Sequence, residues 1–303
     1  MVMIKRVLAL LGSGALAILL LRQAETAAQA VRDGVQLCLT SVVPALFPFF
    51  AVSSLLVALG AAEAAGRVLA HPFRRLFRCG GAGCAALLLG LVGGYPVGAR
   101  TAAELVRRGE LSPAEGARLL TFCNNAGPAF AIGVAGVSVF GSARTGAWLY
   151  LLHCAAALLT GLLFCRRPLP VTAMPKRPVP PQTGLTGQFL RAVEGAVSAM
   201  ARVCGFVVFF LVLTRLLTAL TGLEHPLPLG LLELTGGILR LSGTRGDFVL
   251  AAALMGWGGV CVHCQTAAVL EGSGLHMRGY LSAKAAQAVL SAALAVPISR
   301  WVR

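Results

Sequence analysis

Two adjacent asparagines, Asn124 and Asn125, lie inside an apolar stretch of the sequence and are followed by Gly127 and Pro128. Proline has no backbone N–H and clashes with the carbonyl group four residues before it, so Pro128 predicts a helix that breaks at Asn124. A broken helix leaves backbone donors and acceptors free, and asparagine side chains offer both kinds of group. The four residues are therefore a candidate site for a small polar solute. The alternative is that the asparagines cap a helix or hydrogen-bond one helix to another.

A glycine-rich run from Gly93 to Arg100, Gly-Gly-Tyr-Pro-Val-Gly-Ala-Arg, is the second candidate. Its glycines permit a ligand to approach the backbone closely, and the start of a helix presents free N–H groups to an anion. The guanidinium of Arg100 can pair with a carboxylate through two hydrogen bonds. We therefore take Tyr95, Pro96 and Arg100 as candidate binding residues. The alternative is that the run only anchors its segment at the membrane surface.

Three more polar residues lie among apolar neighbours in the C-terminal half, and polar groups at membrane depth are costly enough to mark candidate sites. His263 can carry a proton near neutral pH, with a hydrogen-bonded structural histidine as the alternative. Gln265 belongs to a second glycine-rich run, at the position that corresponds to Arg100. Glu233 lies in a short apolar segment, where a membrane-buried carboxylate would indicate cation or proton coupling and an interfacial one would not. The full candidate substrate-binding set is Asn124, Asn125, Gly127, Pro128, Tyr95, Pro96, Arg100, His263, Gln265 and Glu233.

The elements that must hold these residues are membrane helices. The chain of 303 residues is 57% hydrophobic and only 12% charged, and its mean hydropathy is +0.81. A soluble domain carries about twice that charged fraction, and a disordered chain has low hydrophobicity, so both classes are excluded. The apolar stretches are rich in Leu, Ala and Gly without period-two alternation, which argues against membrane strands. We predict an all-α polytopic membrane protein with segments at Val7–Leu21, Val42–Gly60, Ala82–Val97, Leu119–Phe140, Ala147–Phe164, Val197–Leu220, Phe248–Leu270 and Leu281–Ile298, and a partial helix at Leu227–Leu241.

The net charge of +15, from 26 Lys and Arg against 11 Asp and Glu, lies mainly in short loops between the apolar stretches. No basic stripe interleaves with aromatic residues, so the positive-inside rule explains the charge better than nucleic-acid binding does. The clusters Arg67–Arg78 and Arg100–Arg118 are both cytoplasmic if Ala82–Val97, between them, leaves and re-enters on one side. Its glycines and Pro96 fit such a re-entrant element. The same rule, applied to the basic residues of the C-terminal half, predicts that Phe248–Leu270 re-enters from the opposite side of the membrane.

Nine cysteines are scattered at irregular spacing, mostly inside apolar stretches, which predicts packing residues and no disulfide framework. Cys261 and Cys264 flank His263 in a single CxxC, a weak metal motif because no second ligand pair follows at zinc-site spacing. Neither Gly-x-Ser-x-Gly nor His-Glu-x-x-His occurs. We therefore expect no metal, no cofactor and no enzymatic activity, with a membrane enzyme built on this CxxC as the alternative.

The two halves of the chain share a short internal repeat. Residues Gly93–Leu105 align with Gly258–Leu270 at a constant offset of 165, and seven of 13 positions are identical. Between the halves, Arg166–Gly187 is rich in proline, glycine and charge and cannot form a regular helix. We predict two inverted repeats, a common plan among secondary transporters, each with a broken or re-entrant helical element. The predicted boundaries are an N-terminal membrane helix at 1–30, a first repeat at 31–165, a cytoplasmic linker at 166–191 and a second repeat at 192–303.

Three motifs in this order resemble the YlbJ (SpoVV) family of sporulation integral membrane proteins, which is grouped with the nucleoside-recognition gate domain proteins. The resemblance covers residues 31–270 and rests on Gly93–Arg100, Phe122–Phe130 and Gly256–Gln265. It implies a role in endospore formation, because SpoVV-like proteins are held to move dipicolinic acid out of the mother cell across the outer forespore membrane. Gate-domain relatives share helix breaks with concentrative nucleoside transporters. The resemblance itself assigns no substrate-binding residue.

The residues and the resemblance together predict a membrane transporter or permease for a small organic anion, with dipicolinic acid as the expected substrate. In this scheme Arg100 offsets carboxylate charge, while Asn124, Asn125 and Gln265 hydrogen-bond the substrate. A nucleoside transporter and a non-transporting assembly protein of sporulation are the alternatives. The expected partners are the small-molecule substrate and the lipid bilayer, without nucleic acid, and a homo-oligomer is left open. The expected location is the bacterial cell membrane, or the outer forespore membrane where the resemblance holds.

Overall fold

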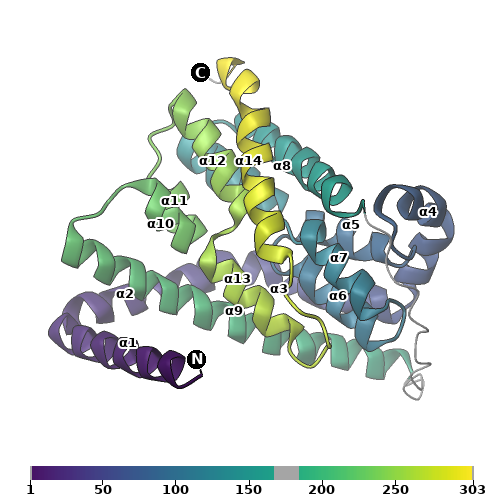
Figure 1. Cartoon of the computed structure of the whole chain (residues 1–303), viewed down its shortest axis with the longest axis horizontal. Helices are drawn as coiled ribbons and strands as arrows, with labels where there is room; N and C mark the ends of the chain where they lie inside the picture. Colours follow the sequence, from purple (N-terminus) through teal and green to yellow (C-terminus); the bar gives the residue numbers. More distant parts are fainter. Residues whose placement is uncertain (1, 167–183, 302–303) are drawn as a thin grey trace.

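The computed structural model describes residues 2–166 and 184–301, and every regular element there is a helix (Figure 1). The predicted all-α class is therefore confirmed. In chain order the elements are α1 (Val2–Arg22), α2 (Ala24–Leu37), η1 (Cys38–Val42), α3 (Val43–Ala58), α4 (Ala61–Phe77), α5 (Gly83–Gly93), α6 (Val97–Arg107), α7 (Pro113–Cys123), η2 (Ala129–Val139), α8 (Ala143–Phe164), α9 (Leu185–Thr221), α10 (Pro226–Leu232), α11 (Leu234–Ile238), α12 (Arg245–Trp257), α13 (Gly259–Leu270), α14 (Tyr280–Ile298) and η3 (Ser299–Trp301). Segments η1 and η2 are π-helical, and η3 is a short 3-10 turn.

Fewer helices than predicted are long enough to cross a bilayer. Within the described ranges, four helices pass that test by length and composition, and α1 with α2 makes a fifth if the pair is one span bent by 95°. A bilayer needs roughly 20 apolar residues, so the eight predicted segments, two of which were expected to re-enter, outnumber the described helices that are long enough to span. Three of the predicted segments are represented only by shorter apolar helices, at Leu46–Leu56, Gly83–Gly93 and Ala129–Val139. The four long spans are Ala143–Phe164, Leu185–Thr221, Arg245–Leu270 and Tyr280–Trp301.

The three predicted helix breaks are all present. The Gly-Gly-Tyr-Pro run separates α5 from α6, residues 124–127 separate α7 from η2, and Gly258 separates α12 from α13. Gly94, Gly258 and Gly259 have φ angles of +79°, +90° and +83°, a region that glycine enters without steric cost. A fourth break, at Glu233 between α10 and α11, lies inside the predicted partial helix.

The first interrupted element folds back on itself. Gly80, before α5, lies beside the side chain of Leu111, which follows α6, so the outer ends of the two helices are together. Near the turn, a Cβ on Gly90 would lie 2.8 Å from the Cα of Gly98, so the two backbones are in contact. Helices α5 and α6 therefore form a helical hairpin, the shape expected of a re-entrant element.

The second interrupted element does not fold back. Helices α12 and α13 run as one apolar span of 26 residues, Arg245–Leu270. The expected re-entry of Phe248–Leu270 is therefore not seen, because the break at Gly258 interrupts the helix without reversing the chain. The arrangement of the two halves as inverted copies stays a prediction.

The short internal repeat is nevertheless visible in the backbone. Gly94 and Gly259 are equivalent in the alignment, and both have a positive φ. Thr101 and Thr266 are also equivalent, and each hydroxyl donates to the carbonyl four residues earlier, at 2.9 and 2.8 Å. Helices α6 and α13, which follow the two equivalent breaks, therefore share local geometry. The complete elements differ, because α5 and α6 form a hairpin and α12 and α13 form one span.

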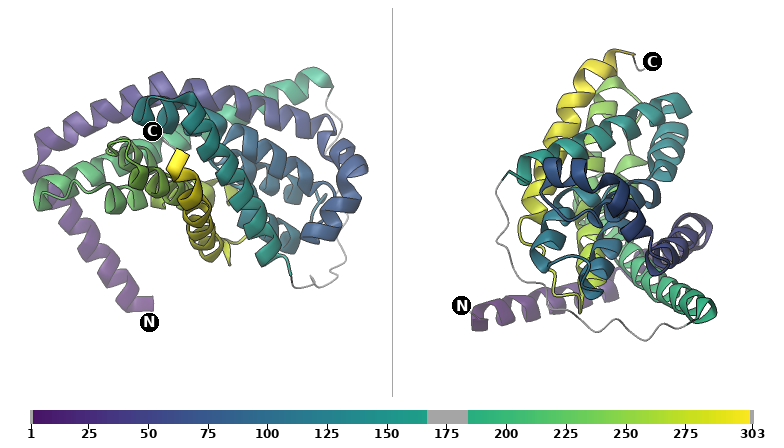
Figure 2. Two further views of the ribbon diagram at one scale, coloured as in Figure 1. Left: turned by 90° about the horizontal axis from the view of Figure 1, so that it is seen from above. Right: turned by 90° about the vertical axis from the view of Figure 1, so that its right-hand side faces the viewer.

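Helix α14 is central to the packing and contacts α7, α8 and α12 (Figure 1). The 37-residue helix α9 runs along one side of the molecule against α2, α3 and α13. Helix α1 extends away from the other helices (Figure 2). The predicted linker at 166–191 falls largely outside the described residues. Its last residues, from Leu185 on, belong to helix α9. A helix can begin there because the last proline of the linker sequence is Pro181.

Candidate solute-binding site

The first three helix breaks meet in the interior. A Cβ on Gly94, in the first break, would lie 3.0 Å from the backbone N of Gly127 in the second. The hydroxyl of Tyr95 donates to the backbone oxygen of Met255 at 2.7 Å, just before the third break. A residue next to the hairpin turn therefore joins the two halves of the chain.

The fourth break adjoins the third. A Cβ on Gly259 would lie 3.1 Å from the backbone N of Leu234, the first residue of α11, and one on Gly258 would lie 3.3 Å from the ring of Tyr95. The interrupted ends of several helices are thus gathered in one region, which is how discontinuous helices build a solute site.

A cavity of about 450 Å³ lies where the breaks meet. Small-molecule sites commonly enclose about 300–1,000 Å³. Most of its wall is apolar and comes from η1, α3, α9 and η2 as well as from the breaks. Four of the predicted site residues line it: Tyr95, Gly127, Glu233 and Gln265.

Glu233 is buried and serves as the N-cap of α11. Its Oε1 accepts from the backbone N of Thr235 at 3.0 Å, and its Oε2 accepts from that of Gly236 at 2.6 Å. Free N–H groups at a helix start stabilise an acidic cap. Capping of α11 therefore accounts for the buried carboxylate of Glu233. A role of Glu233 in cation or proton coupling stays a prediction.

Gln265 presents its amide to the cavity. Its Nε2 donates to the Sγ of Cys261 at 3.3 Å, a weak bond because sulfur is a poor acceptor. The residue is buried and lies near the middle of α13, at the position equivalent to Arg100 in α6. This amide is the side-chain group in the cavity wall best placed to hydrogen-bond a solute.

A second polar region adjoins the cavity at Tyr95. We call it the polar cluster, and its members are fully or almost fully buried: Asn124, Asn125, Thr266, Tyr280, Lys284 and Gln287. They come from the break after α7, from α13 and from α14. The predicted asparagine pair therefore lies in this cluster, one residue before the cavity wall begins at Ala126.

Lys284 is the centre of the cluster and has no exposed surface. Its Nζ donates to the backbone oxygen of Asn124 and, at 2.7 Å, to the Oε1 of Gln287. The Asn124 carbonyl is free because Pro128, four residues later, has no N–H to bond it. The ammonium also lies 5.2 Å from the ring centroid of Tyr95, within cation–π range.

The amide of Gln287 is held in one orientation. Its Nε2 donates to the Oδ1 of Asn125 at 2.9 Å, so its oxygen is turned toward Lys284. Asn125 in turn donates through Nδ2 to the backbone oxygen of Phe122 at 2.7 Å. The chain of bonds leaves neither amide free to flip without losing a partner.

The side chain of Asn124 bonds the second half of the chain. Its Nδ2 donates to Thr266 Oγ1 at 2.9 Å and to the Tyr280 hydroxyl at 3.1 Å. The Nδ1 of His263 lies 3.4 Å from the same hydroxyl, and its ring packs edge-on against Trp257. His263 is thus at the rim of the cluster, and in the described part of the chain its Nε2 has no hydrogen-bond partner.

His153 of α8 supports the break from another side. Its Nε2 accepts from the backbone N of Ala126 at 3.0 Å, so this nitrogen carries no proton. The histidine is 1% exposed. It satisfies one of the backbone donors that the interrupted helix releases.

The charge of the cluster is not neutralised nearby. Among the residues that the structure describes, Lys284 has no carboxylate within 4.0 Å, and the ion pairs lie elsewhere. A buried ammonium without a carboxylate is costly even when hydrogen-bonded. Ionisable groups of this kind inside membrane segments mark functional sites.

Besides the asparagine pair and His263, three more predicted site residues lie outside the cavity wall. The guanidinium of Arg100 packs over the ring of Phe50, 5.3 Å from its centroid, and reaches toward Gly195 of α9. This position does not support the predicted pairing of Arg100 with a substrate carboxylate. Pro96 precedes α6 and Pro128 precedes η2, where they shape the breaks without lining the cavity.

Lys284, Gln287, Tyr280 and His153 were not among the residues predicted from the sequence. A signal for three of them exists in α14, where polar residues recur every three or four positions in an otherwise apolar helix. All four members of this stripe have no exposed surface: Tyr280, Lys284, Gln287 and Ser291. Residues at that spacing share one helix face, and polar ones at membrane depth face the protein interior. His153 has no such pattern.

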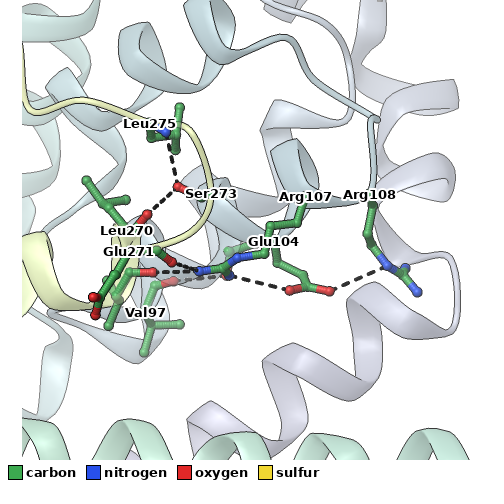
Figure 3. Close-up of polar contacts among 10 residues, drawn as sticks. Val97, Glu104, Arg107, Arg108, Leu270, Glu271, Ser273 and Leu275 are labelled. Carbon is green, nitrogen blue, oxygen red and sulfur yellow. Dashed lines mark hydrogen bonds and ion pairs between the residues drawn. The ribbon is translucent and has the colours of Figure 1, made fainter. Parts of the chain in front are cut away.

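The hairpin is also bonded to the second half at the far end of α13 (Figure 3). Arg107 donates through one terminal nitrogen to the backbone oxygens of Val269 and Glu271, at 3.0 and 2.9 Å. It satisfies carbonyls that the end of a helix leaves unpaired. Glu104 lies 3.7 Å from Arg107 and 3.6 Å from Arg108 and so helps to fix the guanidinium.

The CxxC does not form part of a metal centre within the described ranges. No group of three His, Cys, Asp or Glu side chains is gathered there. Cys261 lies against Gln265, and His263 between them points into an aromatic environment.

The apolar spans and the gathered breaks define a helical integral membrane protein. Residues 39–144, which include the hairpin and the break after α7, match the family model Gate, described as nucleoside recognition. The chain is 27% identical to "Sporulation integral membrane protein YlbJ" of Bacillus subtilis (strain 168), over 87% of this chain and 75% of that protein. The family resemblance predicted from three motifs is therefore confirmed. No solved structure matches the chain.

Proposed function

We propose that this protein carries a small organic anion across a membrane during sporulation, with dipicolinate as the first candidate. The observation that carries the proposal is the cavity of about 450 Å³ where four interrupted helices meet. Interrupted membrane helices offer backbone donors and acceptors to a solute without exposing them to lipid.

The preference for an anion rests on charge. A buried carboxylate, Glu233, and a buried lysine, Lys284, lie near the cavity. The carboxylate of Glu233 accepts from two backbone N–H groups at the start of α11, and the ammonium of Lys284 donates to two oxygens behind Tyr95. Because Lys284 lies beside Tyr95, an anion bound at the Tyr95 end of the cavity, away from the engaged carboxylate of Glu233, would be attracted to its ammonium.

The link to sporulation comes from similarity, and dipicolinate is the substrate that the family resemblance implies. The Bacillus relative is named for sporulation and for the membrane, and it covers most of this chain. Dipicolinate is a flat aromatic dicarboxylate, which fits a mainly apolar cavity with the Gln265 amide and the Thr235 hydroxyl in its wall. On this proposal the protein acts in the outer forespore membrane.

A nucleoside is the second candidate. The matching family model is described as nucleoside recognition, and it covers the hairpin and Gly127, both of which reach the cavity. A nucleoside is neutral and rich in donors and acceptors, so its binding would depend on Gln265 and not on the positive field.

The decisive experiment is uptake of labelled dipicolinate and labelled nucleosides into liposomes that contain the purified protein. Replacing Gln265 with Ala should raise KM about tenfold, the effect of losing one good hydrogen bond to a charged ligand. The matched control is Gln36→Ala, because Gln36 is exposed and does not line the cavity.

Binding without transport is measured separately by thermal stabilisation of the purified protein, since a ligand of the native state must raise its apparent stability. If nucleosides are taken up and dipicolinate is not, the proposed substrate is a nucleoside and not an organic anion. Neither uptake nor stabilisation by either solute, with the protein intact, would favour a non-transporting assembly protein and contradict the proposal.

A further inference from the structure

We propose that Lys284 is a tethered cation: its ammonium fills a monovalent-cation site formed by the break after α7 and by Gln287, a site that would take a free cation if the lysine were removed. This inference goes beyond transport of a solute. Only its consequence for ion coupling rests on the proposed function.

The groups around the ammonium are those that bind a hard cation. Lys284 Nζ contacts the backbone oxygen of Asn124 and the amide oxygen of Gln287, and it faces the ring of Tyr95. Carbonyl and amide oxygens are ligands of alkali and alkaline-earth ions, and an aromatic face also attracts a cation. The side-chain oxygen of Asn124 is a further buried acceptor without a partner in the described part of the chain.

The site is preorganised by bonds that do not involve the lysine. Gln287 is held through its Nε2 by Asn125, and Asn125 is held by the backbone of Phe122. The Asn124 carbonyl is exposed to the site by Pro128, which cannot donate to it. The oxygens would therefore keep their positions around an empty space if the lysine side chain were shortened.

A tethered cation differs from a dissociable one in its occupancy. The lysine stem fixes the ammonium at a high effective concentration, so the site does not empty when the salt concentration falls. No carboxylate lies within 4.0 Å of the ammonium in the described residues, so the two oxygens and the Tyr95 ring are the groups that stabilise its charge. On the proposed function, transport would then need neither Na⁺ nor K⁺ to assemble the site.

The test is thermal unfolding of the purified protein in choline chloride, NaCl, KCl or methylammonium chloride at equal ionic strength. The wild-type midpoint should be the same in all four salts. Lys284→Ala should be strongly destabilised in choline, and Na⁺, K⁺ or methylammonium should raise its midpoint saturably, by about 3 °C or more. Choline is too large to enter and serves as the reference.

Two further variants separate charge from packing. Lys284→Met replaces the stem without the charge, so it should be destabilised and insensitive to all the salts. Lys284→Ala with Gln287→Ala should lose the salt response, because one of the cation ligands is gone.

A Lys284→Met variant as stable as the wild type would overturn the proposal, because it would show that the cluster needs no cation. The same holds if Lys284→Ala folds but responds equally to choline and to the small cations. If Lys284→Ala is recovered only when prepared in a small cation, the proposal is supported. Recovery in none of the salts, with Lys284→Met stable, would overturn it. The readout needs no solute, so it is independent of whether dipicolinate is transported.

Discussion

The cavity and the polar cluster meet at Tyr95, yet they are built in opposite ways. The cavity has a volume of about 450 Å³ and a mostly apolar wall, and in the described part of the chain the Gln265 amide donates to a sulfur alone. In the cluster, Lys284, Gln287 and Asn125 are hydrogen-bonded to one another and to the backbone.

This difference separates two tasks that the sequence presents as one. A solute can enter where there is space, which is the cavity. The cluster holds the interrupted helix in shape and places a positive charge beside that space. On the proposed function, Asn124 and Asn125 support the site from behind its wall, and Gln265 would contact the solute directly.

The difference between the two regions is tested most directly by replacing one glutamine in each region with alanine. Gln287→Ala leaves an ammonium donor and the Asn125 Oδ1 without partners, which should cost about 3 kcal/mol or more of unfolding free energy. Gln265→Ala should cost less than about 1 kcal/mol, because it loses only a bond to sulfur. Denaturant unfolding in detergent measures both, and equal losses would mean that the two regions are not distinct.

A second test concerns the contact that keeps the regions adjacent. A Cβ on Gly98 would overlap the carbonyl oxygen of Cys123, at the end of α7. Gly98→Ala should therefore force the hairpin away from the break and cost roughly 2 kcal/mol. Gly205→Ala is the matched control, since nothing lies within 4 Å of its added Cβ. A Gly98→Ala protein with the stability of the Gly205→Ala protein would show that this close approach is unimportant.

A third test removes the hydroxyl oxygen of Tyr95, the residue at which the two regions meet. Tyr95→Phe loses the hydrogen bond to the Met255 carbonyl but keeps the ring in the cavity wall and over Lys284. We expect a loss of about 1 kcal/mol in stability with little change in KM. A large rise in KM with unchanged stability would instead make the hydroxyl a substrate contact.

The smallest effect is expected at Arg100. Because its guanidinium packs on Phe50 away from the cavity, Arg100→Gln should cost less than about 1 kcal/mol and leave KM for the anion unchanged. Uptake kinetics in liposomes provide the measurement. A tenfold rise in KM would restore the role predicted for Arg100 and move the anion site toward α3.

The breaks were predictable because their causes are local. Pro128 lacks a donor and Gly94 and Gly258 adopt positive φ angles, and these properties belong to the residues themselves. The direction of Arg100 was not predictable, since it depends on how the hairpin packs against α3 and α9. Fold-back of one glycine-rich element but not the other is likewise a tertiary outcome.

Lys284 was missed for a different reason. The positive-inside rule uses Lys and Arg in loops to orient the chain, and it sets aside a lysine that falls inside a helix. The polar residues on the same helix face are what indicate that such a lysine is buried. Lys284 and Gln287, with Tyr280 and Ser291, repeat along one face of α14, and that pattern predicts burial.

The bonds from Arg107 to the end of α13 restrict how this molecule can change shape. They pin a corner of the hairpin to the second half of the chain, with two carbonyl oxygens on one guanidinium nitrogen. A rocking motion that opened the interior alternately to either side would have to pivot at this corner or break both bonds. Because Tyr95, before the other end of α6, is bonded to Met255, the hairpin is held to the second half at both ends of this helix and should move together with it.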